Sequence, residues 1–255
     1  MSESQQTSRP SRKTLLIALA CTVAGLGIGW GWQQWSSSAD PAASLSTDER
    51  AAIETVVHDY LIEHPEVLPK AMEALQRKEN ASALSGIRGD VTKEWPGQVL
   101  GNPAGKITLV EFTDFACTYC RQSEADVEAL VRANPELKVV IRQLPILSSE
   151  SADAAKWGMA AAEQGKYSAF HHAMYAAGKP DARTIEAAAR AAGLDMARAQ
   201  KVVADPRVEA ELGRNIELAR QLGFNGTPSW VIGDALLSGA VGKERLQAAI
   251  KDSQS

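Results

Sequence analysis

The fold of this chain is decided by residues 107–120, which read ITLVEFTDFACTYC. The first six are apolar or β-branched apart from Glu111, and apolar character on both faces is typical of a central strand. The segment Cys117–Cys120 lies where the loop after this strand gives way to a helical pattern, which Pro135 stops. A second β-rich run follows at residues 139–141. Strand, helix and strand in so short a span predict a βαβ unit with parallel strands and a right-handed crossover.

Farther along the chain, residues 149–222 are rich in alanine and have helical periodicity, which glycines and prolines break into four or five helices. The β pattern returns at residues 229–232, turns at Gly233-Asp234, and is followed by a helix at residues 243–250. The sequence therefore predicts an α/β sheet split by a helical insertion, within a domain that covers residues 97–251.

Residues 46–80 precede this domain and predict two helices separated by His64-Pro65. Ser46 and Glu49 have the spacing of a capping box at the start of the first helix. Each helix has an apolar stripe that needs cover, either by docking onto the core or by pairing with copies from other chains as an oligomerisation arm. Residues 80–96 are expected to be a polar connection.

The N-terminus predicts a membrane segment. Residues 1–13 carry three basic side chains and precede an almost uncharged apolar run at residues 14–32, which nearly spans a hydrocarbon core of roughly 30 Å. The positive-inside rule makes residues 1–13 a cytoplasmic tail. The run is expected to be a transmembrane signal-anchor, or a signal peptide cleaved near Ser37-Ser38-Ala39, and residues 33–45 to be a linker. Both alternatives place the rest on the periplasmic side of a bacterial inner membrane, anchored or free.

Composition excludes several classes of protein. Hydrophobic residues at 45% and charged residues at 23% match an ordinary globular protein. A formal net charge of −4 without a Lys/Arg cluster argues against nucleic-acid binding. Only three cysteines occur, Cys21, Cys117 and Cys120, which are too few for a scaffold held by disulfides.

The pair Cys117 and Cys120 carries the predicted chemistry. Cys117 lies at a helix N-terminus, where free N–H groups and the helix dipole stabilise a thiolate and lower its pKa from about 8.5. A stabilised thiolate makes the corresponding disulfide an oxidant. Cys120, one turn later on the same face, is expected to be more buried and to resolve mixed disulfides. Thr118 and Tyr119 are expected to contact the substrate, and Tyr119 also to tune the thiolate.

Other interpretations of the cysteine pair compete with redox chemistry. A zinc site needs two more ligands, and the candidates are Cys21 and four scattered histidines. His171 and His172 are expected to be structural, because adjacent residues of a helix face different directions. A structural disulfide that closes so small a ring restrains the unfolded chain little. Binding of cuprous copper stays open, since soft thiolates select that ion; no cofactor other than the redox-active disulfide is expected.

Three segments resemble the DsbA family of thioredoxin-like proteins: residues 110–120 (VEFTDFACTYC), 170–175 (FHHAMY) and 226–233 (GTPSWVIG). Residues 60–68 (YLIEHPEVL) are similar to the helical extension of its suppressor-of-copper-sensitivity branch, ScsC. The resemblance covers roughly residues 50–251. It implies a thioredoxin-like fold and an extracytoplasmic thiol–disulfide oxidoreductase, with unfolded or cysteine-containing proteins as substrates and a redox partner in the membrane.

The resemblance also implies roles for residues away from the cysteines. Pro228 would follow a cis peptide bond beside the active site, and the backbone of Thr227 would pair with a bound substrate strand. Glu111 matches a buried acidic residue; such a carboxyl has a raised pKa and could take the proton of Cys120, unless it points outward from the sheet. Thr118-Tyr119 departs from the Pro-His dipeptide of strong oxidases and is closer to that of isomerases and of the ScsC branch. Oxidase, isomerase and reductase activities therefore all stay open.

Overall fold

A computed structural model of the chain describes residues 45–254, so the predicted cytoplasmic tail and membrane segment, and all but the end of the predicted linker, lie outside the described residues. Within residues 45–254, no helix combines the length and the apolar character needed to cross a membrane. The chain divides into two units between Leu68 and Pro69.

The first unit contains helix α2, Thr47–Glu63. Its capping box is confirmed: the Glu49 N–H donates to Ser46 Oγ at 3.3 Å, and the Ser46 N–H donates to Glu49 Oε2 at 2.9 Å. No residue of α2 is buried, and Val56 has 68% of its surface exposed. Cover of its apolar stripe, by docking onto the core or by pairing with other chains, stays a prediction.

Helix α3 (Val67–Leu84) and the short helix α4 (Arg88–Thr92) lead into the core. The polar connection expected at residues 80–96 is wrong, because α3 continues through its first part and α4 occupies its middle. Leu84 and Val91 are both fully buried there, where they pack with side chains of the sheet. These two apolar residues are spaced too widely among polar neighbours to give a periodic signal, so only their packing reveals the segment as part of the core.

The sheet has five strands in the order β1-β3-β2-β4-β5. The strands are β1 (Val99–Gly101), β2 (Ile107–Thr113), β3 (Leu137–Gln143), β4 (Ser229–Ile232) and β5 (Ala235–Ser238). Strands β2 and β3 are parallel, which confirms the predicted βαβ unit, and all other neighbours are antiparallel. The edge strand β1 was not predicted, since three residues are too few to show a period.

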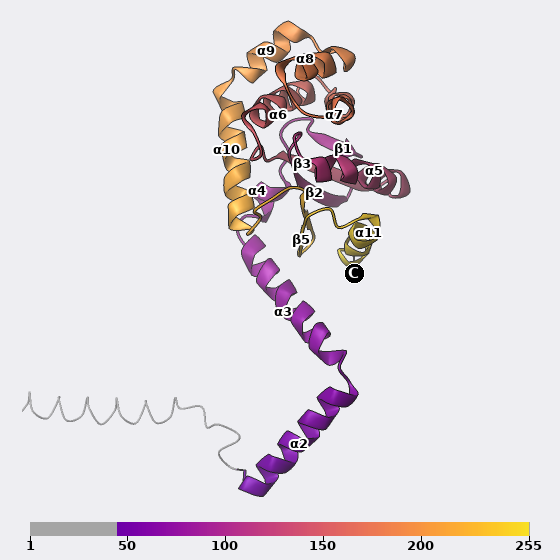
Figure 1. Cartoon of the computed structure of the whole chain (residues 1–255), viewed down its shortest axis with the longest axis vertical. Coiled ribbons are helices and arrows are strands. Elements are labelled where there is room, and N and C mark those ends of the chain that lie inside the picture. Colours follow the sequence, from indigo (N-terminus) through magenta and orange to yellow (C-terminus); the bar gives the residue numbers. More distant parts are fainter. Residues whose placement is uncertain (1–44, 255) are drawn as a thin grey trace, which may run out of the picture. The chain divides into compact units, whose positions relative to one another are not determined.

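Helices pack on the sheet, and a helical insertion separates β3 from β4. Helix α5 joins β2 to β3, and five helices lie between β3 and β4, as Figure 1 shows for α6 to α10. Their bounds are α5 Thr118–Ala133, α6 Ser149–Ala162, α7 Tyr167–Ala177, α8 Ala182–Ala191, α9 Met196–Val203, α10 Pro206–Gln221 and α11 Lys243–Asp252. Helix α11 packs against α5. The α/β class and the helical content of the predicted thioredoxin-like fold are confirmed.

Apolar side chains form two clusters, because successive residues of a strand point to opposite faces of the sheet. Leu109 belongs to the cluster that contains both cysteines and the buried side chains of α5 to α7. Val110 and Phe112 belong to the other, which includes Leu218 of α10. By the same alternation, Glu111 lies on the face of Leu109 and the cysteines.

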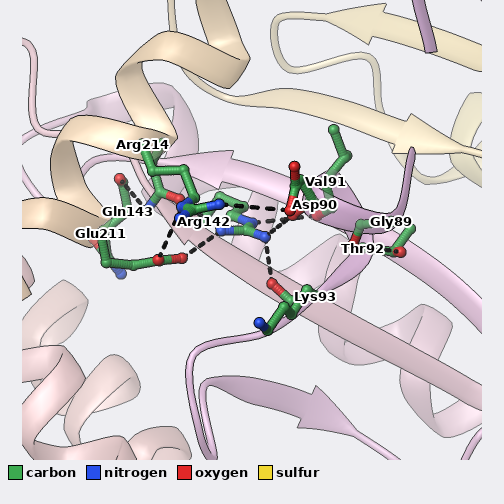
Figure 2. A network of polar contacts seen from close by, with 10 residues as sticks. Gly89, Asp90, Val91, Thr92, Lys93, Arg142, Gln143, Glu211 and Arg214 are labelled. Carbon is green, nitrogen blue, oxygen red and sulfur yellow. Dashed lines mark hydrogen bonds and ion pairs between the residues drawn. The ribbon is translucent and has the colours of Figure 1, made fainter. Parts of the chain in front are cut away.

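A buried arginine holds α4 and the residue after it against the sheet (Figure 2). Arg142 of β3 is 2% exposed and donates to the backbone oxygens of Asp90, Val91 and Lys93. Its guanidinium also donates to Glu211 Oε1 at 2.6 Å and to Asn215 Oδ1 at 2.8 Å on α10. The charge is therefore paired with Glu211, and its other partners come from two segments, residues 90–93 and α10, as a buried ion requires.

Candidate active site

Cys117 and Cys120 lie together at the first turn of α5. Cys117 is the N-cap residue, and its sulfur accepts a hydrogen bond from the Cys120 N–H at 3.3 Å. Both residues are free thiols, with 5% and 1% of their surfaces exposed. Cys117 lies at the end of the loop after β2. Its own backbone is extended (φ −78°, ψ 118°), and the helix begins at the next residue, Thr118. Its sulfur thus faces the unpaired N–H groups of the turn.

The two thiols have opposite acidities. Hydrogen bonding from the Cys120 thiol, with help from the N–H groups of Tyr119 and Cys120, lowers the pKa of Cys117 to about 6 against the effect of burial. Burial raises the pKa of Cys120, and its bond to Cys117 and the charge of Glu111 act in the same direction. At neutral pH the pair therefore holds one thiolate, on Cys117, and one proton, on Cys120.

Glu111 is a buried acid on the central strand. It is 3% exposed, between Ile141 and Trp230 of the neighbouring strands, so the alternative in which it points into solvent is wrong. Burial raises its pKa to about 8, and the charges of Glu124 and Cys117 add to this effect. The expected raised pKa is confirmed, and most molecules carry a neutral Glu111 at pH 7.

Thr227 and Pro228 lie against the cysteines, at the start of β4. The peptide bond between them is cis, as the resemblance implied. The Thr227 carbonyl oxygen lies 3.3 Å from Cys117 Sγ and accepts its hydrogen bond when that thiol is protonated. The Thr227 hydroxyl is buried and has no hydrogen-bond partner among the described residues. Thr118 and Tyr119, in contrast, are exposed, with 63% of the Tyr119 surface open to solvent.

Asp114 is a further residue of this region that the sequence analysis missed. Its carboxylate accepts hydrogen bonds from the N–H groups of Ala116, Ile146 and Leu147, at 2.8, 3.0 and 3.0 Å. It thereby ties the loop after β3 to the loop before Cys117. An aspartate directly after a strand is a signal for such a turn, but the second loop is far away in the sequence.

A buried polar network lies beneath the cysteines, and it too was missed. Thr113 Oγ1 is 2.7 Å from the Tyr175 hydroxyl, while the Tyr167 hydroxyl accepts from Gln143 at 3.0 Å and lies 3.2 Å from His171 Nδ1. Burial lowers the pKa of His171 to about 3, so this ring is neutral. The prediction that the two histidines face different directions is confirmed, since His171 is 2% exposed and the His172 side chain 40%. Their tyrosine partners could not be identified from periodicity.

The tertiary structure thus brings Cys117, Cys120, Glu111 and the Thr227-Pro228 bond together from three separate segments. Thr118 and Tyr119 border this group on the exposed side. The arrangement can stabilise a thiolate, hold a proton on a second sulfur and store another on a buried carboxyl. These are the elements needed for thiol–disulfide exchange.

Comparison with known proteins agrees with this geometry. Residues 108–251 match the family of DSBA-like thioredoxin domains, and residues 49–81 match the N-terminal domain of the copper resistance protein ScsC. Over 156 residues the chain is 29% identical to the Na(+)/H(+) antiporter NhaA 3 of Salinispora tropica, but it covers 24% of that protein. The chain thus spans about a quarter of the length of the curated relatives it matches, and their transport activity is not carried over.

Solved structures give longer matches. A thioredoxin-like oxidoreductase from Silicibacter pomeroyi DSS-3 is 42% identical with a TM-score of 0.62, over 66% of this chain and 97% of that chain. A linker-deletion mutant of Proteus mirabilis ScsC is 28% identical with a TM-score of 0.62, over 83% and 97%. The thiol-disulfide exchange protein α-DsbA2 of Wolbachia pipientis is 25% identical with a TM-score of 0.65, over 70% and 97%. Because the first family match also spans more than half of the sequence, the chain belongs to the family of DSBA-like thioredoxin domains.

Proposed function

We propose that this protein is an extracytoplasmic oxidoreductase that exchanges disulfides with unfolded or cysteine-containing proteins through Cys117 and Cys120. The observation that carries the proposal is the contrast between the two sulfurs: an N-cap thiol with a pKa of about 6 beside a buried thiol with a raised pKa. One sulfur is ready to attack or leave as a thiolate, and the other retains its proton until it is needed.

In the oxidising direction, a substrate thiolate attacks Cys117 Sγ and the bond between Cys117 and Cys120 breaks. Cys120 leaves with the electron pair and takes up a proton, for which the neutral Glu111 is the nearby source. A second substrate thiolate then attacks the substrate sulfur of the mixed disulfide, and Cys117 leaves as a stable thiolate. The substrate is oxidised by two electrons and the dithiol is reduced.

In the reducing or isomerising direction the same steps run backwards. The Cys117 thiolate attacks a substrate disulfide, and Cys120 resolves the mixed disulfide after it gives its proton to Glu111, once that carboxyl is ionised. With a pKa of about 8 for Glu111, ionised and neutral forms are both accessible near neutral pH. The site therefore supports either direction, and the partner's redox potential selects between them.

The exposed surface around Cys117 suits an unfolded chain as substrate. Tyr119 offers an exposed aromatic ring, and Ile146 and Leu147, on the loop that Asp114 holds, are 43% and 53% exposed. We propose that Thr227 pairs through its backbone with a substrate strand, which would read the main chain and tolerate many sequences. Thr118 would border the same strand.

The proposed compartment rests on two supports. The order of basic tail and apolar run at residues 1–32 predicts export with or without anchoring. A similar protein from Salmonella enterica serovar Typhimurium, 27% identical, is described as a periplasmic thioredoxin-like protein. A membrane redox partner would then restore the disulfide or the dithiol after each cycle.

Cuprous copper is the second candidate ligand of the cysteine pair. Two free thiols at one helix turn offer soft donors, and the N-terminal match is to a domain of a copper resistance protein. Binding of this ion and disulfide exchange would compete for the reduced form.

The decisive experiment measures disulfide exchange with a reduced, unfolded protein substrate and the reduction potential of the Cys117/Cys120 couple. Cys117→Ser is expected to abolish exchange and Cys120→Ser to trap mixed disulfides, while Cys21→Ser serves as the matched control and retains activity. A cuprous-copper titration of the reduced chain tests the second candidate. Undiminished exchange in the Cys117→Ser/Cys120→Ser variant would overturn the proposal, and tight copper binding without any exchange would replace it.

A further inference from the structure

A second group of chemically active side chains lies outside the cysteine site. Glu124 and Glu128, one turn apart on α5, both face His172 of α7. The His172 Nδ1 atom is 2.5 Å from Glu124 Oε1 and 3.4 Å from Glu128 Oε1. One ligand atom from each of the three residues lies within 4.8 Å of the other two. Two carboxylate oxygens therefore converge on a single ring nitrogen.

The other nitrogen of this ring has its own partner. Ser168, four residues earlier on α7, places its hydroxyl oxygen 3.2 Å from His172 Nε2. If Nε2 donates its proton to Ser168, Nδ1 is left with a lone pair that faces the two carboxylates. Histidine ligands of metals usually donate their second ring N–H in this way, which fixes the tautomer and the ring orientation.

The electrostatics of the group call for a positive charge at its centre. Two carboxylates and a nitrogen lone pair repel one another unless a proton or a cation lies between them. The Glu124 side chain is 17% exposed, and the side chains of Glu128 and His172 are about 40% exposed. Arg132 donates to Oε2 of Glu128 at 3.2 Å, which leaves Oε1 toward His172. The centre is thus half-buried and reachable from solvent.

We propose that Glu124, Glu128 and His172 form a binding site for a divalent transition-metal ion, with Zn²⁺ as the representative. The donors are two carboxylate oxygens and one imidazole nitrogen, a set that suits Zn²⁺ and its borderline neighbours and not soft cuprous copper. Typical bonds of about 2.0 to 2.2 Å require small outward rotations of the two glutamates, which their partial exposure allows. Three protein ligands leave a fourth position for water. From the sequence no metal site was expected and His172 was expected to be structural. The three residues approach one another only when α5 and α7 pack.

The test uses the full chain carrying Cys21→Ser, with Cys117 and Cys120 joined in their disulfide, so that no free thiol competes. This protein is titrated with Zn²⁺ in a calorimeter. The same samples are titrated with Co²⁺, whose visible spectrum reports nitrogen and oxygen ligands without a thiolate charge-transfer band. One ion per chain is expected. His172→Ala and Glu124→Gln should each weaken binding at least tenfold, and Ser168→Ala should weaken it about tenfold through the ring orientation. His58→Ala is the matched control, since this exposed histidine also lies beside a carboxylate and should leave the affinity unchanged.

Circular dichroism of each variant verifies that the fold is intact. Glu128→Gln should also weaken Zn²⁺ binding, and because this side chain is 41% exposed the substitution should not disturb the fold. The site is overturned if oxidised protein binds no Zn²⁺ at millimolar concentration. It is equally overturned if His172→Ala and Glu124→Gln bind as tightly as the unaltered chain, which would assign the ion to other residues. Because the cysteines are oxidised throughout, neither result bears on disulfide exchange.

Discussion

Cys117 and Cys120 are the same residue type three positions apart, and their surroundings make one acidic and the other not. The largest cause of the lowered Cys117 pKa is the hydrogen bond from Cys120. The folded-state pKa of about 6 is lower than the ordinary thiol value of about 8.5, so the thiolate stabilises the folded, reduced form fully above that ordinary pKa. This contribution is lost as the pH falls through about 6. A couple tuned in this way is more oxidising than one with ordinary thiols.

We therefore expect the reduced Cys21→Ser chain to show a thiolate titration with a midpoint near pH 6. Replacing Cys120 by alanine as well removes the side-chain donor and should move this midpoint upward. Thiolate absorbance in the ultraviolet measures both. A midpoint near that of an unfolded peptide cysteine in the Cys21→Ser chain would contradict the assigned role of the helix N-terminus.

Glu111 is predicted to make the free energy of unfolding depend on pH in the opposite direction from Cys117. Its folded-state pKa of about 8 is raised from 4.5, so the buried carboxyl stabilises the fold most at pH values below 4.5 and progressively less up to pH 8. Glu111→Gln should abolish this loss, which accumulates from pH 4.5 to pH 7 at about 1.4 kcal/mol per unit, and increase the free energy of unfolding at pH 7 by about 3 kcal/mol. The same variant should slow the release of mixed disulfides, since the proton of Cys120 loses its acceptor.

Urea unfolding at several pH values tests the stability, and the decay of a mixed disulfide on Cys117 in a chain that retains Cys120 tests the proton transfer. Glu54→Gln, an exposed change on α2, is the control for loss of one negative charge. Decay in Glu111→Gln that is as fast as in the unaltered chain, or faster, would rule out the proposed proton transfer. An unchanged pH dependence of the free energy of unfolding would rule out the raised pKa of Glu111.

Among the helices and strands, the contacts of Arg142 show how a single β3 side chain fixes two distant segments. Its guanidinium satisfies three backbone carbonyls at residues 90–93 and two side chains of α10 (Figure 2). Removing it leaves the three backbone carbonyls and Asn215 Oδ1 without this donor in a buried site, and Glu211 retains only its longer contact with Arg214. The energetic cost is that of several unsatisfied buried acceptors and of a broken ion pair, and not merely of one lost contact.

Arg142→Ala is therefore expected to lower the free energy of unfolding by about 3 to 5 kcal/mol in urea denaturation. Arg214→Ala is the matched control, because this neighbouring arginine has 56% of its side chain exposed and pairs with Asp90 and Glu211 at 3.5 and 3.7 Å. Its loss should cost less than about 1 kcal/mol. Equal effects of the two substitutions would show that burial of the guanidinium contributes nothing.

At the scale of the whole molecule, the apolar side chains of α2 are exposed and need a partner. Ile53 is 49% exposed, Val56 68% and Tyr60 52%, and a stripe of this kind is rarely left in water. We propose that it pairs with copies from other chains, which would bring several cysteine sites together and favour isomerase activity. A thiolate in one subunit could then act on a substrate held by another.

Light scattering of the full chain in detergent tests this proposal. An oligomer is expected, and the double variant Ile53→Glu/Val56→Glu should dissociate it to monomers while each site still exchanges disulfides. Glu54→Gln, between the two altered positions, should leave the mass unchanged. A chain that is monomeric without any substitution would refute the pairing and leave docking onto its own core as the alternative.

Local patterns were enough to predict the central strand, the helix that starts at Cys117, and the parallel strand after it. Each of these signals is contained in one window of sequence: a β-rich apolar run, a helical period, and cysteines at the junction. The capping box of α2 was predictable for the same reason, because its partners are three residues apart. The redox pair belongs to this class, since its spacing alone puts both sulfurs on one helix turn.

Contacts between distant segments required the folded chain. Thr227 reaches Cys117 across 110 positions, Asp114 holds a loop 32 positions later, and Arg142 meets α4 from 51 positions away. No periodicity encodes such pairs, because their partners are selected by how the sheet and its helices pack. The same packing decides which residues are buried. Burial raises the pKa of Glu111 and lets its carboxyl hold a proton that it can exchange at neutral pH.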